Sequence, residues 1–142
     1  MPKISALGLD IGNKRIGVAG CDGTGLIATG ITTIRRSSFR EDVAKLQELV
    51  QQRQVQILVV GFPYSMKGEI GVQAQKVQKF ALKLSEALHI PVEFEDERLS
   101  SLEAEELMRN QKQSTRENKA LIDRKAAALI LQRWLDKHRT NN

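Results

Sequence analysis

The sequence is poor in the residue types on which several classes of protein depend. Among its 142 residues are one cysteine, Cys21, and two histidines, which excludes an internal disulfide and argues against a cysteine or histidine zinc site. Aromatic residues make up only 4%, which argues against a stacking platform for single-stranded bases. No apolar run approaches the roughly 20 residues of a membrane-spanning helix, and the N-terminus lacks the apolar region of a signal peptide. We therefore expect a protein of the reducing cytoplasm with no membrane partner.

The length and the apolar content fit one compact domain. Apolar residues make up 41% and charged residues 27% of the chain, so disorder is not expected. We expect a single domain over residues 1–138 and a frayed tail over 139–142. The net charge of +5 is local, because residues 107–142 carry 9 Lys and Arg against 3 Asp and Glu. Such a basic segment is typical of a protein that binds nucleic acid, although a solvated helix face gives the same pattern.

Apolar periodicity predicts three strands followed by alternating helices and strands. Residues 4–9, 15–21 and 26–34 are typical of strands joined by short turns, which form an antiparallel meander. The elements expected after them are helices over 39–52, 69–88, 100–109 and 119–137, strands over 55–60 and 91–95, and a loop over 110–118. This order predicts an α/β protein with a five-stranded mixed sheet flanked by helices on both faces.

Four acidic residues fall at strand ends or on a packed helix face. Asp10 follows the first strand, and Asp96 and Glu97 follow the fifth. Because Ala126–Ala128 allow the last helix to approach the sheet closely, Asp123 can meet Asp10 if that helix packs beside the first strand. Carboxylates brought together stay ionised only if a cation compensates their charge. Oxygen ligands without His or Cys favour Mg²⁺ or Mn²⁺, which can activate water against a phosphodiester.

Each acidic residue also has a simpler interpretation. An aspartate after a strand, such as Asp10, is often a turn former, and Asp96 with Glu97 can be a solvated strand end. Asp123 lies near the N-terminus of its own helix, where the helix dipole favours a negative charge. The joint placement of all four at one end of the predicted sheet is what favours the metal site.

Four motifs, in order along the chain, resemble those of a known family. They are Leu9–Ala19, Val59–Pro63 with Met66 and Gly68, Asp96–Ser100, and Ile122–Asp123 with Ala126–Ala127 and Ile130–Gln132. In these motifs the chain resembles the YqgF-like (RuvX) family of bacterial proteins over nearly its whole length. Where that family usually has a glycine after Lys119, this chain has Ala120.

The resemblance implies a ribonuclease H-like fold, in agreement with the order of strands and helices. It also implies a candidate nuclease that helps to process the 5′ end of pre-16S ribosomal RNA. Carried onto this chain, it makes Asp10, Glu97 and Asp123 catalytic, and it makes these three and Asp96 ligands of Mg²⁺ or Mn²⁺. Of the adjacent pair, Glu97 is preferred for its longer reach. Strand alternation places it with Glu93 and Glu95, on the face opposite Asp96.

Basic residues near these carboxylates are expected to bind nucleic acid, because bare carboxylates repel phosphate. They follow the first turn, the fourth strand and the acidic pair, or lie in a loop over 112–119 that would form a substrate clamp. The candidates are Lys14, Arg15, Lys67, Arg98, Arg116 and Lys119. A solvated turn or a simple flexible connection would account for the same residues.

The leading hypothesis is a metal-dependent endonuclease that acts on pre-16S ribosomal RNA or a pre-ribosomal particle, as a monomer or a homodimer. A DNA endonuclease that resolves Holliday junctions would need a dimer with paired active sites. A non-catalytic assembly factor would bind RNA tightly and salt-sensitively without turnover. A phosphotransferase of the actin-like or sugar-kinase type would need two such domains, and 142 residues supply one.

Overall fold

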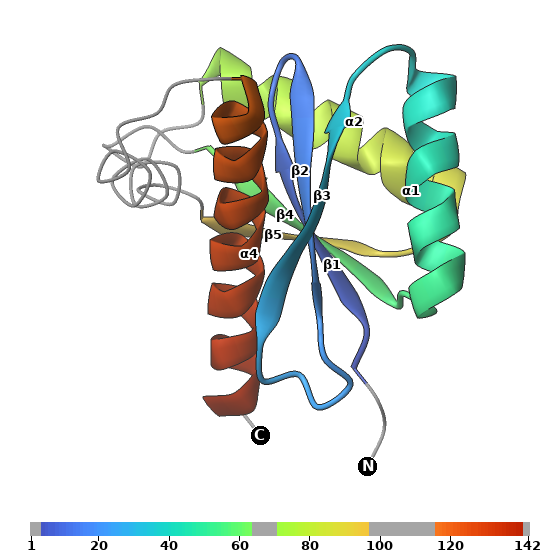
Figure 1. Cartoon of the computed structure of the whole chain (residues 1–142). Coiled ribbons are helices and arrows are strands. Elements are labelled where there is room, and N and C mark those ends of the chain that lie inside the picture. The colour runs from blue at the N-terminus through green and yellow to red at the C-terminus, as the bar shows by residue number, and fades with distance from the viewer. Residues whose placement is uncertain (1–3, 64–70, 97–115, 141–142) are drawn as a thin grey trace.

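The structure, a computed structural model, describes residues 4–63, 71–96 and 116–140. Figure 1 shows a sheet with helices on both of its faces. The strands are β1 (Ala6–Ile11), β2 (Arg15–Cys21), β3 (Ala28–Arg35), β4 (Ile57–Phe62) and β5 (Val92–Asp96). The helices are α1 (Phe39–Arg53), α2 (Val72–Leu88) and α4 (Arg116–Thr140).

The five strands form one mixed sheet in the order β3-β2-β1-β4-β5, as the sequence predicts. The pairs β1–β2 and β2–β3 are antiparallel, which confirms the meander, and the pairs β1–β4 and β4–β5 are parallel. The carboxyl ends of β1, β4 and β5 therefore lie at the same end of the sheet. In open α/β sheets this end is where ligands bind.

The sheet separates two apolar layers. On one face α1 and α2 pack against residues such as Leu9 and Leu58, while α4 packs on the other face against residues such as Ala6 and Val59. In Figure 1 the red helix α4 lies on one side of the strands and α1 on the other. The neighbours Leu58 and Val59 are both fully buried, one in each layer, which confirms that both faces of β4 are covered.

Helix α4 packs directly against the strand backbone, and glycines permit this approach. A Cβ atom at Gly17 of β2 would lie 2.0 Å from the carbonyl oxygen of Asp123. A Cβ atom at Gly8 of β1 would lie 2.8 Å from the carbonyl oxygen of Ala127. No side chain fits at either position unless the helix moves. The close approach confirms the expectation from Ala126–Ala128, and Ala126 and Ala127 are fully buried.

Strand β1 is longer at its carboxyl end than the sequence predicts. It continues to Ile11, so Asp10 lies within the strand and pairs with Gly17, rather than following the strand as a turn former. The pairing with β2 closes the hairpin, since the Gly12 amide donates to the Arg15 carbonyl oxygen at 2.8 Å. Asp10 is thereby fixed in the β1–β2 pair, one residue after the last pair of β1 with β4, Leu9–Val60.

The last helix also differs from its prediction. It begins at Arg116, so residues 116–118 are helical rather than part of a loop. The first turns are held against β3, because Thr33 Oγ1 donates to the Ala120 carbonyl oxygen at 2.5 Å and Asn118 is buried. The polar composition of this segment concealed the helix. Its other end reaches Thr140, beyond the predicted start of a frayed tail at residue 139.

Other boundaries shift by one to three residues. Helix α2 begins at Val72 after Gly71 as N-cap, rather than at about residue 69. The helix predicted over 100–109 lies outside the described residues. Of the helices that the structure describes, none is long and apolar enough to span a membrane.

Replacing Gly17 with alanine should destabilise the protein by at least about 1–3 kcal/mol, the usual cost of overpacking. The added methyl group would meet the Asp123 carbonyl oxygen and force α4 away from the sheet. Urea unfolding followed by circular dichroism measures this loss. Gly71→Ala is the control, because nothing lies within 4 Å of its Cβ position, and its change should stay below about 1 kcal/mol. Equal unfolding midpoints for the two variants would contradict the close approach.

Candidate active site

Asp10 and Asp123 are far apart in the sequence but lie on the same face and at the same end of the sheet. Asp10 lies directly opposite Gly17 in the β1–β2 pair. Residues opposite each other in an antiparallel pair point to the same face. The Cβ position of Gly17 faces the Asp123 backbone, so the Asp10 side chain points toward α4 at the level of Asp123. The structure thus brings two of the four predicted acidic residues to one place.

Arg15 holds the carboxylate of Asp123. Its Nε atom lies 2.6 Å from Asp123 Oδ2, and the two side chains are 34% and 20% exposed. Arg15 lies two residues before Gly17 on β2 and therefore shares its face. A guanidinium stays charged at any physiological pH, so it compensates part of the negative charge at this site permanently. Within the described part of the chain, Asp123 Oδ1 has no hydrogen-bond donor.

The other two predicted ligands are not brought into this arrangement by the described residues. Asp96 ends β5 beside Phe62 of β4, and alternation along β5 places it with Phe94 on the face away from α4. Glu97 lies outside the described residues, so its role as catalytic residue and ligand stays a prediction. Among residues 4–63, 71–96 and 116–140, no three acidic, histidine or cysteine side chains lie close enough to hold a metal.

Two acidic residues that the sequence did not single out lie on the α4 face of β5. Glu95 is 6% exposed and forms an ion pair with Lys137. Glu93 accepts a hydrogen bond from Trp134 Nε1 at 3.2 Å. Both partners come from the C-terminal half of α4, so these carboxylates anchor that half of the helix to β5. Trp134 is itself buried in the apolar layer between α4 and the sheet.

Three of the predicted nucleic-acid-binding residues line one cavity beside the Arg15–Asp123 pair. The cavity has a volume of about 330 Å³. Its lining residues are Lys14, Arg15, Thr33, Arg35, Lys119 and Ala120. Lys14, Arg35 and Lys119 are exposed, so their ammonium and guanidinium groups are accessible to a phosphate.

Arg35 is a member of this cavity that sequence reasoning missed. It pairs with Arg15 in the β2–β3 register, which puts both guanidinium groups on the α4 face. Only knowledge of that register would have found it. Two predicted residues, Lys67 and Arg98, lie outside the described residues, and Arg116 is described only as the first residue of α4.

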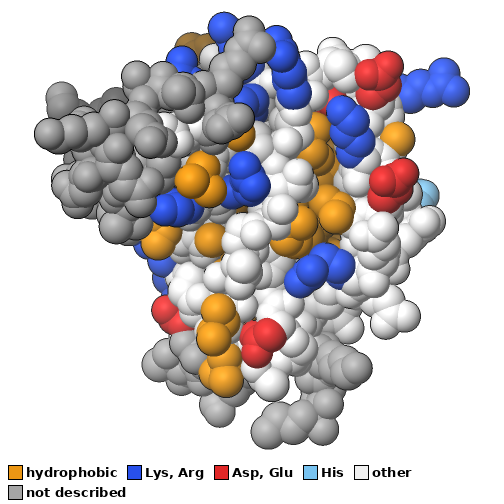
Figure 2. All heavy atoms as spheres, in the orientation of Figure 1, with side chains coloured by type: hydrophobic (Ala, Val, Ile, Leu, Met, Phe, Trp, Pro, Cys, Tyr) orange, Lys and Arg blue, Asp and Glu red, His pale blue; other side chains and the backbone are white. Residues whose placement is uncertain are grey.

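Charge is unevenly distributed over this face of the molecule. Figure 2 shows most Lys and Arg side chains of the face toward the end that carries the β1–β2 turn and along α4. Acidic side chains on this face lie mainly over α1 and at the opposite end. A basic rim beside Asp10 and Asp123 is the arrangement that an acidic site needs in order to admit a polyanion.

Comparison with known sequences identifies the family. Residues 4–137 match the RuvX family, described as Holliday junction resolvase. The chain belongs to the RuvX family. A relative from Crocosphaera subtropica is 63% identical over 99% of this chain and 99% of its own length. A relative from Acaryochloris marina is 65% identical over 96% of this chain and 94% of its own length. Their names make both relatives candidate pre-16S rRNA nucleases.

Solved structures show the same fold for this RuvX-family chain. RuvC of Thermus thermophilus, solved in complex with a Holliday junction substrate, is 16% identical, with a TM-score of 0.59 over 96% of both chains. A second structure of this RuvC is 14% identical, with a TM-score of 0.54 over 96% of this chain and 97% of that chain. The fold is ribonuclease H-like, as predicted.

The Arg15–Asp123 ion pair should be measurable as a coupling energy. In a double-mutant cycle of Arg15→Met and Asp123→Asn, we expect a coupling of about 0.5–1 kcal/mol in the free energy of unfolding, because the pair is partly solvent-exposed. The control cycle uses Arg35→Met, since Arg35 lines the same cavity without a described acidic partner. Its coupling to Asp123→Asn should be near zero. Equal couplings for Arg15 and Arg35 would mean a diffuse charge effect and contradict the pair.

Proposed function

We propose that this RuvX-family protein is a metal-dependent endonuclease that processes the 5′ end of pre-16S ribosomal RNA in the cytoplasm. The main support for the proposal is the position of Asp123. Its backbone lies against Gly17, the residue paired with Asp10, so both aspartates lie on one face near the carboxyl end of β1. The choice of RNA is supported by relatives that are 63% and 65% identical over nearly the whole chain and are candidate pre-16S rRNA nucleases.

The donors at this site fit a hard divalent cation. Asp10 and Asp123 offer carboxylate oxygens on one face of the sheet. Together with Glu97 they would hold Mg²⁺ or Mn²⁺, which when bound supplies an activated water and stabilises the leaving oxygen of a phosphodiester; Asp96, on the other face of β5, does not fit this set. Arg15 fixes the orientation of the Asp123 carboxylate by holding Oδ2. This pre-orientation removes part of the ordering cost of ligand binding.

The basic residues of the neighbouring cavity would bind the phosphates of the substrate. Lys14, Arg35 and Lys119 are exposed there and offset the repulsion between the carboxylates and the RNA backbone. We propose that Lys67, Arg98 and Arg116 extend this basic surface.

The test is cleavage of two labelled substrates, a 5′ segment of pre-16S rRNA and a four-way DNA junction, each with Mg²⁺, Mn²⁺ or EDTA. The wild-type protein should cut the RNA only with metal. Asp10→Asn should lower that rate at least about 100-fold, more than loss of an outer partner of a metal ligand usually does. Asp136→Asn, the same change at an exposed residue near the end of α4, should cut normally. Circular dichroism verifies that both variants are folded.

Each other outcome speaks against the proposal in a defined way. Equal cutting by Asp10→Asn would exclude the site itself. Cutting of the junction alone would favour a Holliday junction resolvase, the activity in the family description, and would require a dimer with paired sites. Binding of RNA without cutting under any condition would favour an assembly factor.

A further inference from the structure

A second basic cavity, a groove along α2, lies on the opposite face of the sheet from Asp123. It has a volume of about 410 Å³ and opens between α2 and the turn that follows β1. Its cations are Arg36, which directly follows β3, and three lysines of α2, Lys76, Lys79 and Lys83. The lysines recur at steps of three and four residues, which places them on one helix face. None of these four residues belongs to the surface already assigned to nucleic acid.

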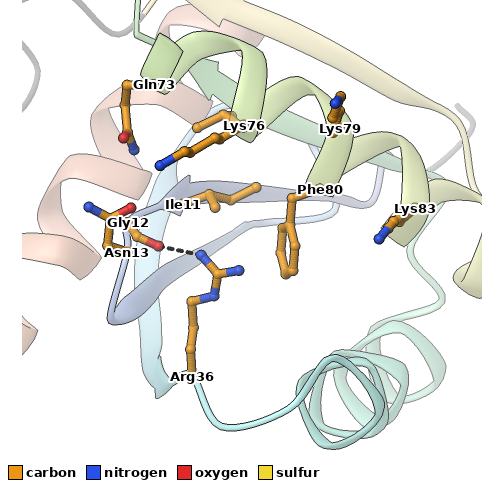
Figure 3. A pocket seen from close by; sticks show the side chains of 10 residues that line it. Ile11, Gly12, Asn13, Arg36, Gln73, Lys76, Lys79, Phe80 and Lys83 are labelled. Atoms are coloured by element: carbon orange, nitrogen blue, oxygen red, sulfur yellow. Dashed lines mark hydrogen bonds between the residues drawn. The ribbon is translucent and has the colours of Figure 1, made fainter.

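Aromatic contacts order two of the four cations of this cavity, Arg36 and Lys83. The Arg36 guanidinium carbon lies 4.2 Å from the centre of the Phe80 ring, and Arg36 Nη1 donates to the Gly12 carbonyl oxygen at 2.6 Å. Lys83 Nζ lies 5.9 Å from the centre of the Phe39 ring. Figure 3 shows Arg36 beside Phe80 with its bond to Gly12, and Lys76 extending from α2 toward the Gly12–Asn13 turn. The charges of Arg36 and Lys83 are thus held in place by contacts that do not neutralise them.

The positive charge of the lining residues favours the binding of a phosphate backbone. In the described part of the chain, no carboxylate lies within ion-pair distance of Arg36, Lys76, Lys79 or Lys83, so none of the described acidic residues compensates their positive charge. The one aromatic ring in the lining, Phe80, already has Arg36 over it and Phe39 packed against it at 5.8 Å between centres. A base therefore has no free ring on which to stack, and the four cations of the lining favour contacts to phosphates.

The position of the cavity connects it to the acidic site. Its wall includes Ile11, Gly12 and Asn13, which directly follow Asp10 along the chain. Three residues of extended chain span at most about 10 Å. At about 3.4 Å of rise per nucleotide in a stacked strand, that corresponds to at most about three nucleotides, and to fewer in an extended strand. The consecutive residues Arg35 and Arg36 line the two basic cavities on the two faces of the sheet, so cations flank the carboxyl end of β1 on both sides.

We infer that the groove formed by Arg36, Lys76, Lys79 and Lys83 binds the phosphodiester backbone of the RNA a few nucleotides from the bond that is cut. The inference rests on the proposed nuclease function and extends it, because it assigns a second backbone contact across the end of the sheet. The contact is independent of base sequence. It anchors a strand that passes from the α2 face over the β1–β2 turn to Asp10.

The test measures RNA binding in EDTA, so that no cutting occurs, by fluorescence anisotropy at several salt concentrations. Lys76→Gln/Lys83→Gln should lower the slope of log K against log salt by about 1.4, two single-strand phosphate contacts at about 0.7 each. At 0.1 M salt the affinity should fall roughly ten- to thirty-fold. The matched control is Arg40→Gln/Lys45→Gln, which removes the same charge from exposed positions of α1 that line neither basic cavity. Its slope should stay within about 0.3 of wild type.

Strand length provides the second arm of the experiment. The α2 variant should lose much more affinity for a 12-nucleotide RNA than for a dinucleotide, whose single phosphodiester makes at most one of the contacts. An equal loss for both lengths, or an equal loss in the α1 control, would overturn the assignment of the groove. Normal RNA binding by the α2 variant would overturn it while leaving the proposed nuclease intact. By contrast, wild-type protein that fails to cut pre-16S rRNA with metal, yet shows the predicted loss in slope, would contradict only the nuclease.

Discussion

The contact between the backbone of α4 and the glycines of the sheet decides where the functional groups lie. At Gly17 the helix backbone occupies the space that any side chain would need. This contact fixes the distance of α4 from β1 and β2. It thereby also fixes the position of Asp123 relative to Asp10. It also lets Arg15, two residues before Gly17, reach the Asp123 carboxylate. A residue with any side chain at Gly17 would move one acidic residue away from the other.

Electrostatics then determine what this end of the sheet can bind. Two aspartates on one face are compensated in part by Arg15, and cations line cavities on both faces of the sheet. Strand alternation is the cause, because it sends Arg35 toward α4 while the next residue, Arg36, lies against Phe80 of α2. Elsewhere acidic residues serve as structural ties, as Glu95 does with Lys137 of α4.

Much of the architecture could be predicted from local sequence patterns. Alternation and apolar runs predicted the strands, and Ala126–Ala128 predicted the close approach of α4, because these signals depend on neighbours along the chain. The N-terminal turn of α4 could not be predicted in this way. Residues 116–118 are polar and lack apolar periodicity, and the contact that holds this end of the helix, Thr33 of β3 with the Ala120 carbonyl oxygen, is distant in sequence.

The candidate site likewise has some residues that local sequence patterns predict and others that they do not. The sequence predicts that Asp10 and Asp123 can meet, and the structure has both on one side of the sheet, although Asp10 lies within β1 and not after it. Arg35 depends on the β2–β3 register, and the groove of α2 depends on how Arg36 packs on Phe80. Such partners are distant in sequence, and no local pattern encodes them. The preference for Glu97 over Asp96 agrees with the observed alternation along β5, and the role of Glu97 stays a prediction.

The most direct test of the central claim is paramagnetic broadening of backbone amide signals by Mn²⁺ in solution. The account predicts that substoichiometric Mn²⁺ broadens the amides of Asp10, Gly17 and Asp123 first, and that Asp10→Asn and Asp123→Asn each weaken this effect. A broadening centred on acidic residues of α1, such as Glu41 and Glu48, or one that is unchanged in both variants, would contradict a metal site at the carboxyl end of β1.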